Sequence, residues 1–269
     1  MDYKRLISNR NSVREFKNTS VEQKYFNEIE SYIKESKKLL PQIEVEIKIF
    51  DHKDSYEKLK NLAGYNGYMI EAPHYAIILS QIKEGYIENS GYTGEKLILK
   101  ARDLEVDSCW VTFKDSNSIK KNLNISSDKD VTAIIALGYE DEKNIKNKTT
   151  SERLGVEEIV FMNEWNNNAS VTELEERCLL EAFSYARMAP SSFNRQPWRF
   201  IIDGGKVILA VKEDDFTSSY EGSIDTGIAM LYFSLIIDTT MFDLKWHVGS
   251  IEQDYKIPKD YKIVGYCNI

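Results

Sequence analysis

The sequence predicts an α+β fold, in which helices and strands mix without the strict alternation of parallel βαβ proteins. Ile43–Ile49 alternates apolar and charged residues, which is typical of a half-exposed strand. Tyr75–Leu79 and Ala133–Leu137 are continuous apolar runs and therefore predict buried strands. Hydrophobic residues make up 42% of the chain and aromatic residues 12%, enough for a packed core.

A helix is predicted before Pro190, beginning at Thr172, with Glu175 completing a capping box. Its apolar stripe consists of Leu174, Cys178, Ala182, Tyr185, Ala186 and Ala189. Further along, two short apolar runs, Arg199–Ile202 and Val207–Val211, flank a turn and predict a hairpin. The turn is Asp203-Gly-Gly-Lys206, which no helix follows, so it is not a phosphate-binding loop.

The two halves of the chain repeat the same elements in the same order. A Thr-Gly pair opens a predicted helix in each half, at Thr93-Gly94 and at Thr226-Gly227. A strand containing tryptophan follows in each half, and then a strand with a Gly-Tyr pair near its end (108–113 and 133–139, then 244–248 and 261–266). We therefore expect an internal duplication, with one half over residues 1–163 and the other over 164–269.

Composition excludes several classes of function. A net charge of −8 argues against a general nucleic-acid or anionic-membrane surface. No run approaches the ~20 apolar residues of a membrane span, and the first ten residues lack the apolar core of a signal peptide, so we expect a cytoplasmic protein. The three cysteines form no C-x-x-C pair and there are only three histidines, so no metal site is expected and the thiols should be buried or half-buried: Cys109, Cys178 and Cys267.

The most informative stretch for function is 186–200. Helical spacing stops at Pro190, and the turn that follows offers four polar side chains, Ser191, Ser192, Asn194 and Gln196. Polar residues that tolerate unusual backbone angles, placed between a helix and a strand, favour a binding loop. Trp198, at the start of the following strand, is expected to be a core residue.

A second phrase lies near the N-terminus, where Arg10 and Arg14 stand four residues apart with Ser12 between them. Residues at this spacing share a face of a helix or turn. Two guanidinium groups and a hydroxyl suit a phosphate, which arginine can bind through two hydrogen bonds. Taken alone, the phrase is also compatible with a solvated turn.

Together the two phrases resemble the nitroreductase family. A-P-S-x-x-N-x-Q-P-W resembles the flavin-contacting loop of that family, and R-x-S-x-R-x-F resembles its phosphate-binding start. The resemblance covers nearly the whole chain. It implies a nitroreductase fold and a site shared between two subunits, one supplying the arginines and the other the loop.

The chain departs from the usual family arrangement in one respect. The two phrases are about 175 residues apart, whereas in a usual member the loop follows the arginines within the same short chain. The first half has 38–43 where its loop should be, and the second has 164–170 where its arginines should be, so each half keeps the phrase that the other has lost. This pattern predicts two tandem half-repeats that form an intramolecular pseudo-dimer with one FMN site; a monomer is the first expectation and a homodimer the alternative.

The resemblance also implies roles for single residues. The phosphate and ribityl end of FMN would contact Arg10, Asn11, Ser12 and Arg14. The flavin ring would contact Pro190, Ser191, Ser192 and Asn194. Asn66 would face the pyrimidine edge of the ring, Val111 and Thr112 would bring a backbone N–H to flavin N5, and Arg153 would reach the phosphate end. Asn66 could instead be an ordinary turn residue, and Arg153 a solvated linker charge.

The activity implied is hydride transfer from NAD(P)H through flavin N5 to an electron-poor acceptor such as a nitroaromatic, a quinone or another flavin. Such a reaction needs no protein base, and the sequence suggests no Ser-His-Asp or Cys-His arrangement. The preference between NADH and NADPH cannot be read, since no dinucleotide fingerprint is present. Two alternatives stay open: a flavin carrier or sensor without turnover, and a flavin-free interaction module.

Overall fold

The computed structural model describes residues 1–64, 68–141, 151–213, 215, 218–240 and 243–269. These residues divide into two compact units: unit 1 is Met1 with Asn9–Thr150, and unit 2 is Asp2–Ser8 with Ser151–Ile269. The first helix, α1 (Tyr3–Asn9), therefore groups mostly with unit 2, where Lys4 lies 2.5 Å from Glu181. The boundary predicted at 163/164 concerns the duplicated sequence and stays a prediction.

Unit 1 is built on an antiparallel five-stranded sheet in the order β1-β3-β5-β4-β2. Its strands are β1 (Val45–Asp51), β2 (Ala63–Gly64), β3 (His74–Ser80), β4 (Asp107–Phe113) and β5 (Asp130–Gly138). Its helices are α2 (Gln23–Glu35), α3 (His52–Leu59), α4 (Tyr86–Asp103) and α5 (Ser116–Asn122). The strands predicted at 43–49, 75–79 and 133–137 are thereby confirmed as β1, β3 and β5.

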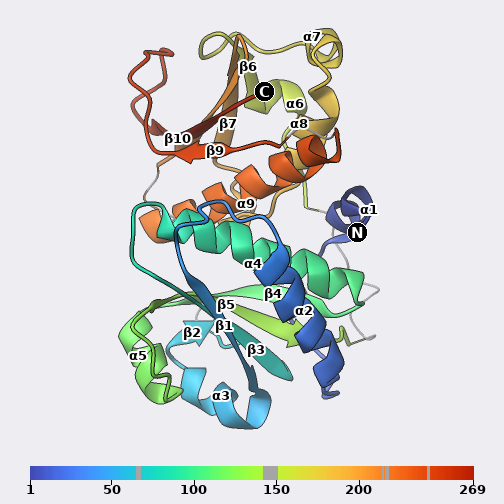
Figure 1. Cartoon of the computed structure of the whole chain (residues 1–269), viewed down its shortest axis with the longest axis vertical. Helices are drawn as coiled ribbons and strands as arrows, with labels where there is room; N and C mark the ends of the chain where they lie inside the picture. Colours follow the sequence, from blue (N-terminus) through green and yellow to red (C-terminus); the bar gives the residue numbers. More distant parts are fainter. Residues whose placement is uncertain (65–67, 142–150, 214, 216–217, 241–242) are drawn as a thin grey trace. The chain divides into compact units, whose positions relative to one another are not determined.

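Helices cover both faces of this sheet (Figure 1). On one face, α2 and α4 pack Ile29 and Leu97 against Ile78 and Ile135. On the other, α3 and α5 supply Leu59 and Ile119, which pack with the opposite face of β3 and β5. Because both faces of these two central strands are buried, their sequences read as continuous apolar runs rather than alternating ones.

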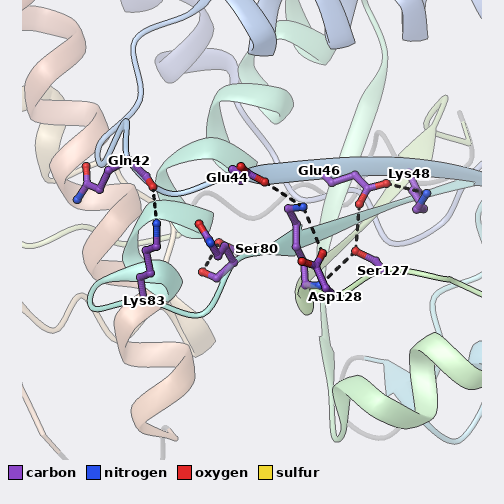
Figure 2. Close-up of polar contacts among 10 residues, drawn as sticks. Gln42, Glu44, Glu46, Lys48, Ser80, Lys83, Ser127 and Asp128 are labelled. Atoms are coloured by element: carbon purple, nitrogen blue, oxygen red, sulfur yellow. Dashed lines mark hydrogen bonds and ion pairs between the residues drawn. The ribbon is translucent and has the colours of Figure 1, made fainter.

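The edge strand β1 carries a network of polar contacts instead (Figure 2). Glu46 Oε1 lies 2.7 Å from Lys48 Nζ, and Ser127 donates to Glu46 Oε2 over 3.2 Å. Lys129 Nζ lies 3.2 Å from Glu44 and Lys83 donates to the carbonyl of Gln42, at the end where β1 begins. Charged side chains along an edge strand hinder unwanted pairing with another sheet, which explains the alternating pattern of this segment.

Unit 2 has its own five-stranded sheet, in the order β6-β7-β8-β10-β9. The strands are β6 (Val160–Met162), β7 (Trp198–Asp203), β8 (Lys206–Lys212), β9 (Trp246–Val248) and β10 (Tyr261–Asn268). The helices are α6 (Val156–Ile159), α7 (Val171–Glu176), α8 (Leu180–Ala186) and α9 (Ser219–Ile237), with short 3₁₀ turns at Ser192–Asn194 and Asp238–Thr240. Helices α8 and α9 cover one face through an aromatic cluster of Phe183, Phe200, Phe233 and Trp246.

The two sheets share one topology. Four strands follow the order β1-β3-β5-β4 in unit 1 and β7-β8-β10-β9 in unit 2, every pair antiparallel. A long helix, α4 or α9, follows the second of these strands in each unit. The predicted α+β fold with two tandem halves is confirmed, as is the hairpin, which is formed by β7 and β8 around Gly204-Gly205.

Three details of the predicted helices are wrong. The helix expected over 172–189 is two helices, α7 and α8, because Cys178 has φ of 58° and breaks the run. Its capping box is Ser170 with Glu173, not Thr172 with Glu175. Helices α4 and α9 begin at Tyr86 and Ser219, ahead of their Thr-Gly pairs. Cys178 is also exposed, whereas Cys109 and Cys267 are buried as expected.

Candidate functional site

The N-terminal arginine phrase lies beside the start of β4 in unit 1. Ser12 forms a parallel bridge with Ser108, and the backbone N–H of Val13 donates to the carbonyl of Ser108 over 2.9 Å. Further along, the N–H of Lys17 donates to the carbonyl of Tyr139, and the carbonyl of Glu15 accepts from the N–H of Asp141, so the segment also pairs with the residues that follow β5. The phrase is therefore fixed along the sheet, and it is not a freely solvated turn.

Arg10 is held by a carboxylate that the sequence did not single out. Its Nε lies 3.0 Å from Oε1 of Glu95 on α4, and its Nη1 donates to Ser12 Oγ over 2.8 Å. The other oxygen of Glu95 accepts from the indole N–H of Trp110 over 2.7 Å. The side chain of Glu95 is fully buried and that of Arg10 is 8% exposed.

Arg14 is exposed, and it lies close enough to Cys109 on β4 to influence its thiol. Burial raises the pKa of Cys109, while the charges of Arg14 and Arg10 and a hydrogen bond with Ser12 act in the opposite direction. The two arginines and the serine thus all act on the pKa of one thiol. We call Arg10, Ser12 and Arg14 the arginine cluster.

Trp110 can reach Glu95 only because α4 carries glycine at the point of contact. A Cβ at Gly94 would lie 2.4 Å from Cη2 of Trp110, so the indole packs directly on the helix backbone. Thr93-Gly94 was read from the sequence as the start of a helix. In the structure the pair lies within α4 and makes room for the tryptophan.

Two other predicted residues follow Trp110 on β4. Val111 is buried, and Thr112 donates from Oγ1 to the carbonyl of Gly64 on β2 over 2.6 Å. Both therefore lie on a strand whose first residues run beside the arginine cluster. Asn66 lies outside the described residues.

In unit 2 the stretch 189–196, here called the Pro190 loop, has an unusual backbone. Phe193, Asn194 and Gln196 have φ values of 53°, 55° and 51°. Left-handed angles are uncommon outside glycine, and for a bulky residue such as Phe193 they mark strain that the surrounding structure must hold. Phe193 is also 59% exposed. Strain combined with exposed aromatic surface is typical of a functional loop.

Several polar groups of the Pro190 loop fasten it to the rest of unit 2. Asn194 Nδ2 donates to the carbonyl of Glu152, Gln196 Oε1 accepts from the N–H of Leu154, and Ser191 Oγ accepts from the N–H of Gln196, each over 2.9 Å. The side-chain oxygen of Asn194 is buried and has no hydrogen-bond partner among the described residues. This oxygen is an acceptor that a ligand N–H could use.

Arg153 and Asp225 also hold the loop. Arg153 Nη1 donates to the carbonyl of Ala189 over 2.9 Å, so this arginine is no ordinary linker charge. Asp225 on α9 is 3% exposed, and its two oxygens lie 3.2 and 3.0 Å from the backbone nitrogen of Ser192. Asp225 was not predicted from the sequence, because its partner Ser192 lies 33 positions away and no local pattern links the two. Trp198 is fully buried, as expected of a core residue.

Elsewhere in unit 1, the ring of His74 contacts Ser20 through one nitrogen and Asp51 through the other. The sequence did not suggest this arrangement. His74 Nε2 lies 3.0 Å from Ser20 Oγ, and Nδ1 lies 2.9 Å from Asp51 Oδ1. The backbone N–H of Val21 donates to the same Nε2 over 2.9 Å, so this nitrogen is unprotonated and Nδ1 carries the proton. Because its lone pair already accepts a backbone donor, we interpret His74 as an anchor for the chain entering α2.

Two further functional classes were tested over the described residues. Among them, no group of three or more His, Cys, Asp or Glu side chains could hold a metal ion. Within the same ranges, no helix has the length and apolar character needed to cross a membrane.

Comparisons with known proteins identify a family for the chain as a whole. The family model described as "Putative TM nitroreductase" matches residues 2–237. A crystal structure of a "putative nitroreductase" from Thermotoga maritima has 20% identity and a TM-score of 0.63, over 100% of this chain and 94% of the other. A crystal structure of the "putative nitroreductase ydfN" from Bacillus subtilis has 16% identity and a TM-score of 0.50, over 58% of this chain and 96% of the other. No curated protein matches the chain.

Proposed function

The chain belongs to the nitroreductase family whose model matches residues 2–237, and is therefore an oxidoreductase; on this premise we propose that it binds one FMN and reduces small electron-poor molecules with NAD(P)H. The proposal assigns the FMN phosphate to the arginine cluster and the flavin ring to the Pro190 loop. It makes the two tandem halves a pseudo-dimer, each half supplying what the other lacks.

The observation that carries the proposal is the arginine cluster. The segment that carries Arg10, Ser12 and Arg14 runs beside Ser108 at the start of β4, and Ser12 is hydrogen-bonded to Arg10. Two guanidinium groups with a hydroxyl between them form a set of donors that suits a phosphate, which arginine binds through paired, charge-assisted hydrogen bonds. Asn11 stays in the proposal as the neighbour of these residues.

The Pro190 loop fits a flavin ring through its shape and one acceptor. Since Ser191 and Asn194 Nδ2 hold the loop itself, the proposal assigns contacts with the ring to the Asn194 side-chain oxygen, Ser192 and Pro190. The hydrogen bonds to Glu152, Leu154 and Asp225 keep this surface fixed, and a preorganised surface loses little entropy on binding. Val111 and Thr112 stay in the proposal for the redox edge of the ring, Asn66 for its pyrimidine edge, and Arg153 for the phosphate end.

Bound FMN would supply the redox chemistry, accepting hydride from NAD(P)H and passing it to a nitroaromatic or quinone. The chain's own residues position the cofactor and provide positive charge and N–H donors where negative charge develops, which is an electrostatic contribution. The proposal includes a cytoplasmic protein, where thiols such as the exposed Cys178 stay reduced. It also includes a monomer, because fusion brings both phrases into one chain.

The experiment is a visible spectrum of the purified protein, with flavin counted per chain after heat release, followed by anaerobic addition of NADH or NADPH. One FMN per chain that loses its absorbance on addition supports the proposal. Two per chain would contradict the single site. Bound flavin that keeps its absorbance would indicate a carrier or sensor, and absence of flavin after reconstitution would favour an interaction module.

A further inference from the structure

Two buried carboxylates stand behind the two phrases, one in each unit. Glu95 on α4 is fully buried and receives Arg10 and Trp110. Asp225 on α9 is 3% exposed and receives the backbone N–H of Ser192. A buried carboxylate destabilises the folded protein unless it is well paired, so packing alone does not explain an acid at either position.

Alignment of the two long helices on their Thr-Gly pairs shows where each acid occurs. Glu95 directly follows Thr93-Gly94, and the corresponding residue after Thr226-Gly227 is Ile228. Asp225 directly precedes the second pair, and the corresponding residue before the first is Tyr92. The acid that holds an arginine is thus present only in the half with the arginines. The acid that holds the loop is present only in the half with the loop.

We propose that Glu95 and Asp225 are positioning residues for the FMN site. Glu95 fixes the Nε side of the Arg10 guanidinium and thereby aims the remainder of the group at the flavin phosphate. Asp225 fixes Ser192 and thereby holds the strained Pro190 loop in the shape that receives the ring. This inference rests on the proposed function. It adds two residues that contact the residues proposed to bind FMN and do not contact FMN themselves.

The two roles predict different ligand preferences, which can be measured with FMN and riboflavin as probes. Riboflavin lacks the phosphate. Glu95→Gln should therefore weaken FMN about tenfold and leave riboflavin unchanged, because a charge-assisted hydrogen bond is lost only at the phosphate end. Asp225→Ala should weaken both ligands by a similar factor, because both share the ring. Asp225→Asn should restore most of the affinity, since an amide oxygen can still accept from Ser192.

Ser234→Ala is the matched control, because Ser234 is a buried polar residue on α9 that accepts from the indole of Trp246 over 3.0 Å. It should change neither affinity. Dissociation constants are measured by flavin fluorescence quenching, and folding of each apoprotein is checked by circular dichroism. If Glu95→Gln does not fold, Trp110→Phe serves in its place, because it removes the other hydrogen bond to Glu95. This variant should also lower the affinity for FMN relative to riboflavin.

Equal losses of FMN and riboflavin in the Glu95 and Trp110 variants would overturn the role of Glu95, and unchanged affinities would do the same. A Glu95→Gln effect without an Asp225→Ala effect would overturn the role of Asp225 alone. These comparisons are made with a wild-type protein that binds flavin. A wild type that binds none would instead overturn the proposed function, and this inference with it.

Discussion

Units 1 and 2 place a tryptophan against the long helix of the same four-stranded scaffold, but they satisfy its indole N–H differently. Trp110 of β4 donates to the buried carboxylate Glu95 on α4, whereas Trp246 of β9 donates to the hydroxyl of Ser234 on α9. The acceptors also occupy different positions relative to the Thr-Gly pairs, because Glu95 directly follows its pair and Ser234 lies two turns beyond its own. A charged acceptor is found where the arginines are retained, and a neutral one where they are not.

The difference shows how a duplicated fold can keep its packing while its polar residues diverge. Apolar cores on both faces of each sheet preserve strand order in both halves. Buried acids are kept only where a polar or charged group nearby needs holding, because an unpaired buried carboxylate would destabilise the fold. The following predictions test this contrast, from the largest expected effect to the smallest.

Arg14→Ala should lower FMN affinity more than tenfold, because a charge-assisted hydrogen bond between arginine and phosphate contributes about 1.5–3 kcal/mol. The measurement is a titration of the apoprotein with FMN. Arg177→Ala is the control in unit 2, where Arg177 donates to the carbonyl of Gly204; it should leave FMN affinity unchanged. Equal retention of FMN by both variants would remove Arg14 from the site.

Gly94→Ala should destabilise the protein by about 1–3 kcal/mol, the usual cost of overpacking a filled contact. The added Cβ would lie 2.4 Å from the ring of Trp110. Gly222→Ala on α9 meets nothing within 4 Å and should instead stabilise by about 0.5–1 kcal/mol through helix propensity. Urea unfolding measures both; the same sign for the two variants would contradict the close packing of Trp110 on α4.

Trp110→Phe should cost more stability than Trp246→Phe. The first removes a donor from a buried carboxylate and the second from a hydroxyl, and bonds to charged groups contribute about 1.5–3 kcal/mol against about 0.5–1.5 kcal/mol for neutral ones. Thermal unfolding of both variants gives the difference. A larger loss for Trp246→Phe would show that packing, and not the acceptor, distinguishes the two sites.

His74 should make unit 1 less stable in mild acid. Burial lowers the pKa of His74 below the usual value for histidine, an effect that Asp51 partly opposes. The neutral form is favoured in the folded protein, so the stabilisation is complete above about pH 6.5 and falls as the pH drops from there through the folded pKa. Unfolding curves between pH 5 and 8 test this. In His74→Gln, which keeps an acceptor for Val21, this part of the pH dependence should vanish; an unchanged slope would contradict it.

The arginine phrase and the Pro190 loop could be predicted because each is a short local sequence with its own chemistry. Glu95 and Asp225 could not, since each acts on a residue 85 or 33 positions away and lies in a helix whose pattern gives no sign of it. Asn194 was expected to contact the flavin ring through its side-chain amide. In the structure one end of that amide holds Glu152, a contact that only folding creates.

The sequence by itself determined the α+β class, the buried strands, the duplication and the two phrases, because apolar periodicity and turn chemistry are properties of neighbouring residues. Only the tertiary structure decided where α4 and α9 begin, where the helix before Pro190 breaks, and which acids hold Arg10 and Ser192. These depend on packing and on the cost of burying charge, which arise only when distant segments meet.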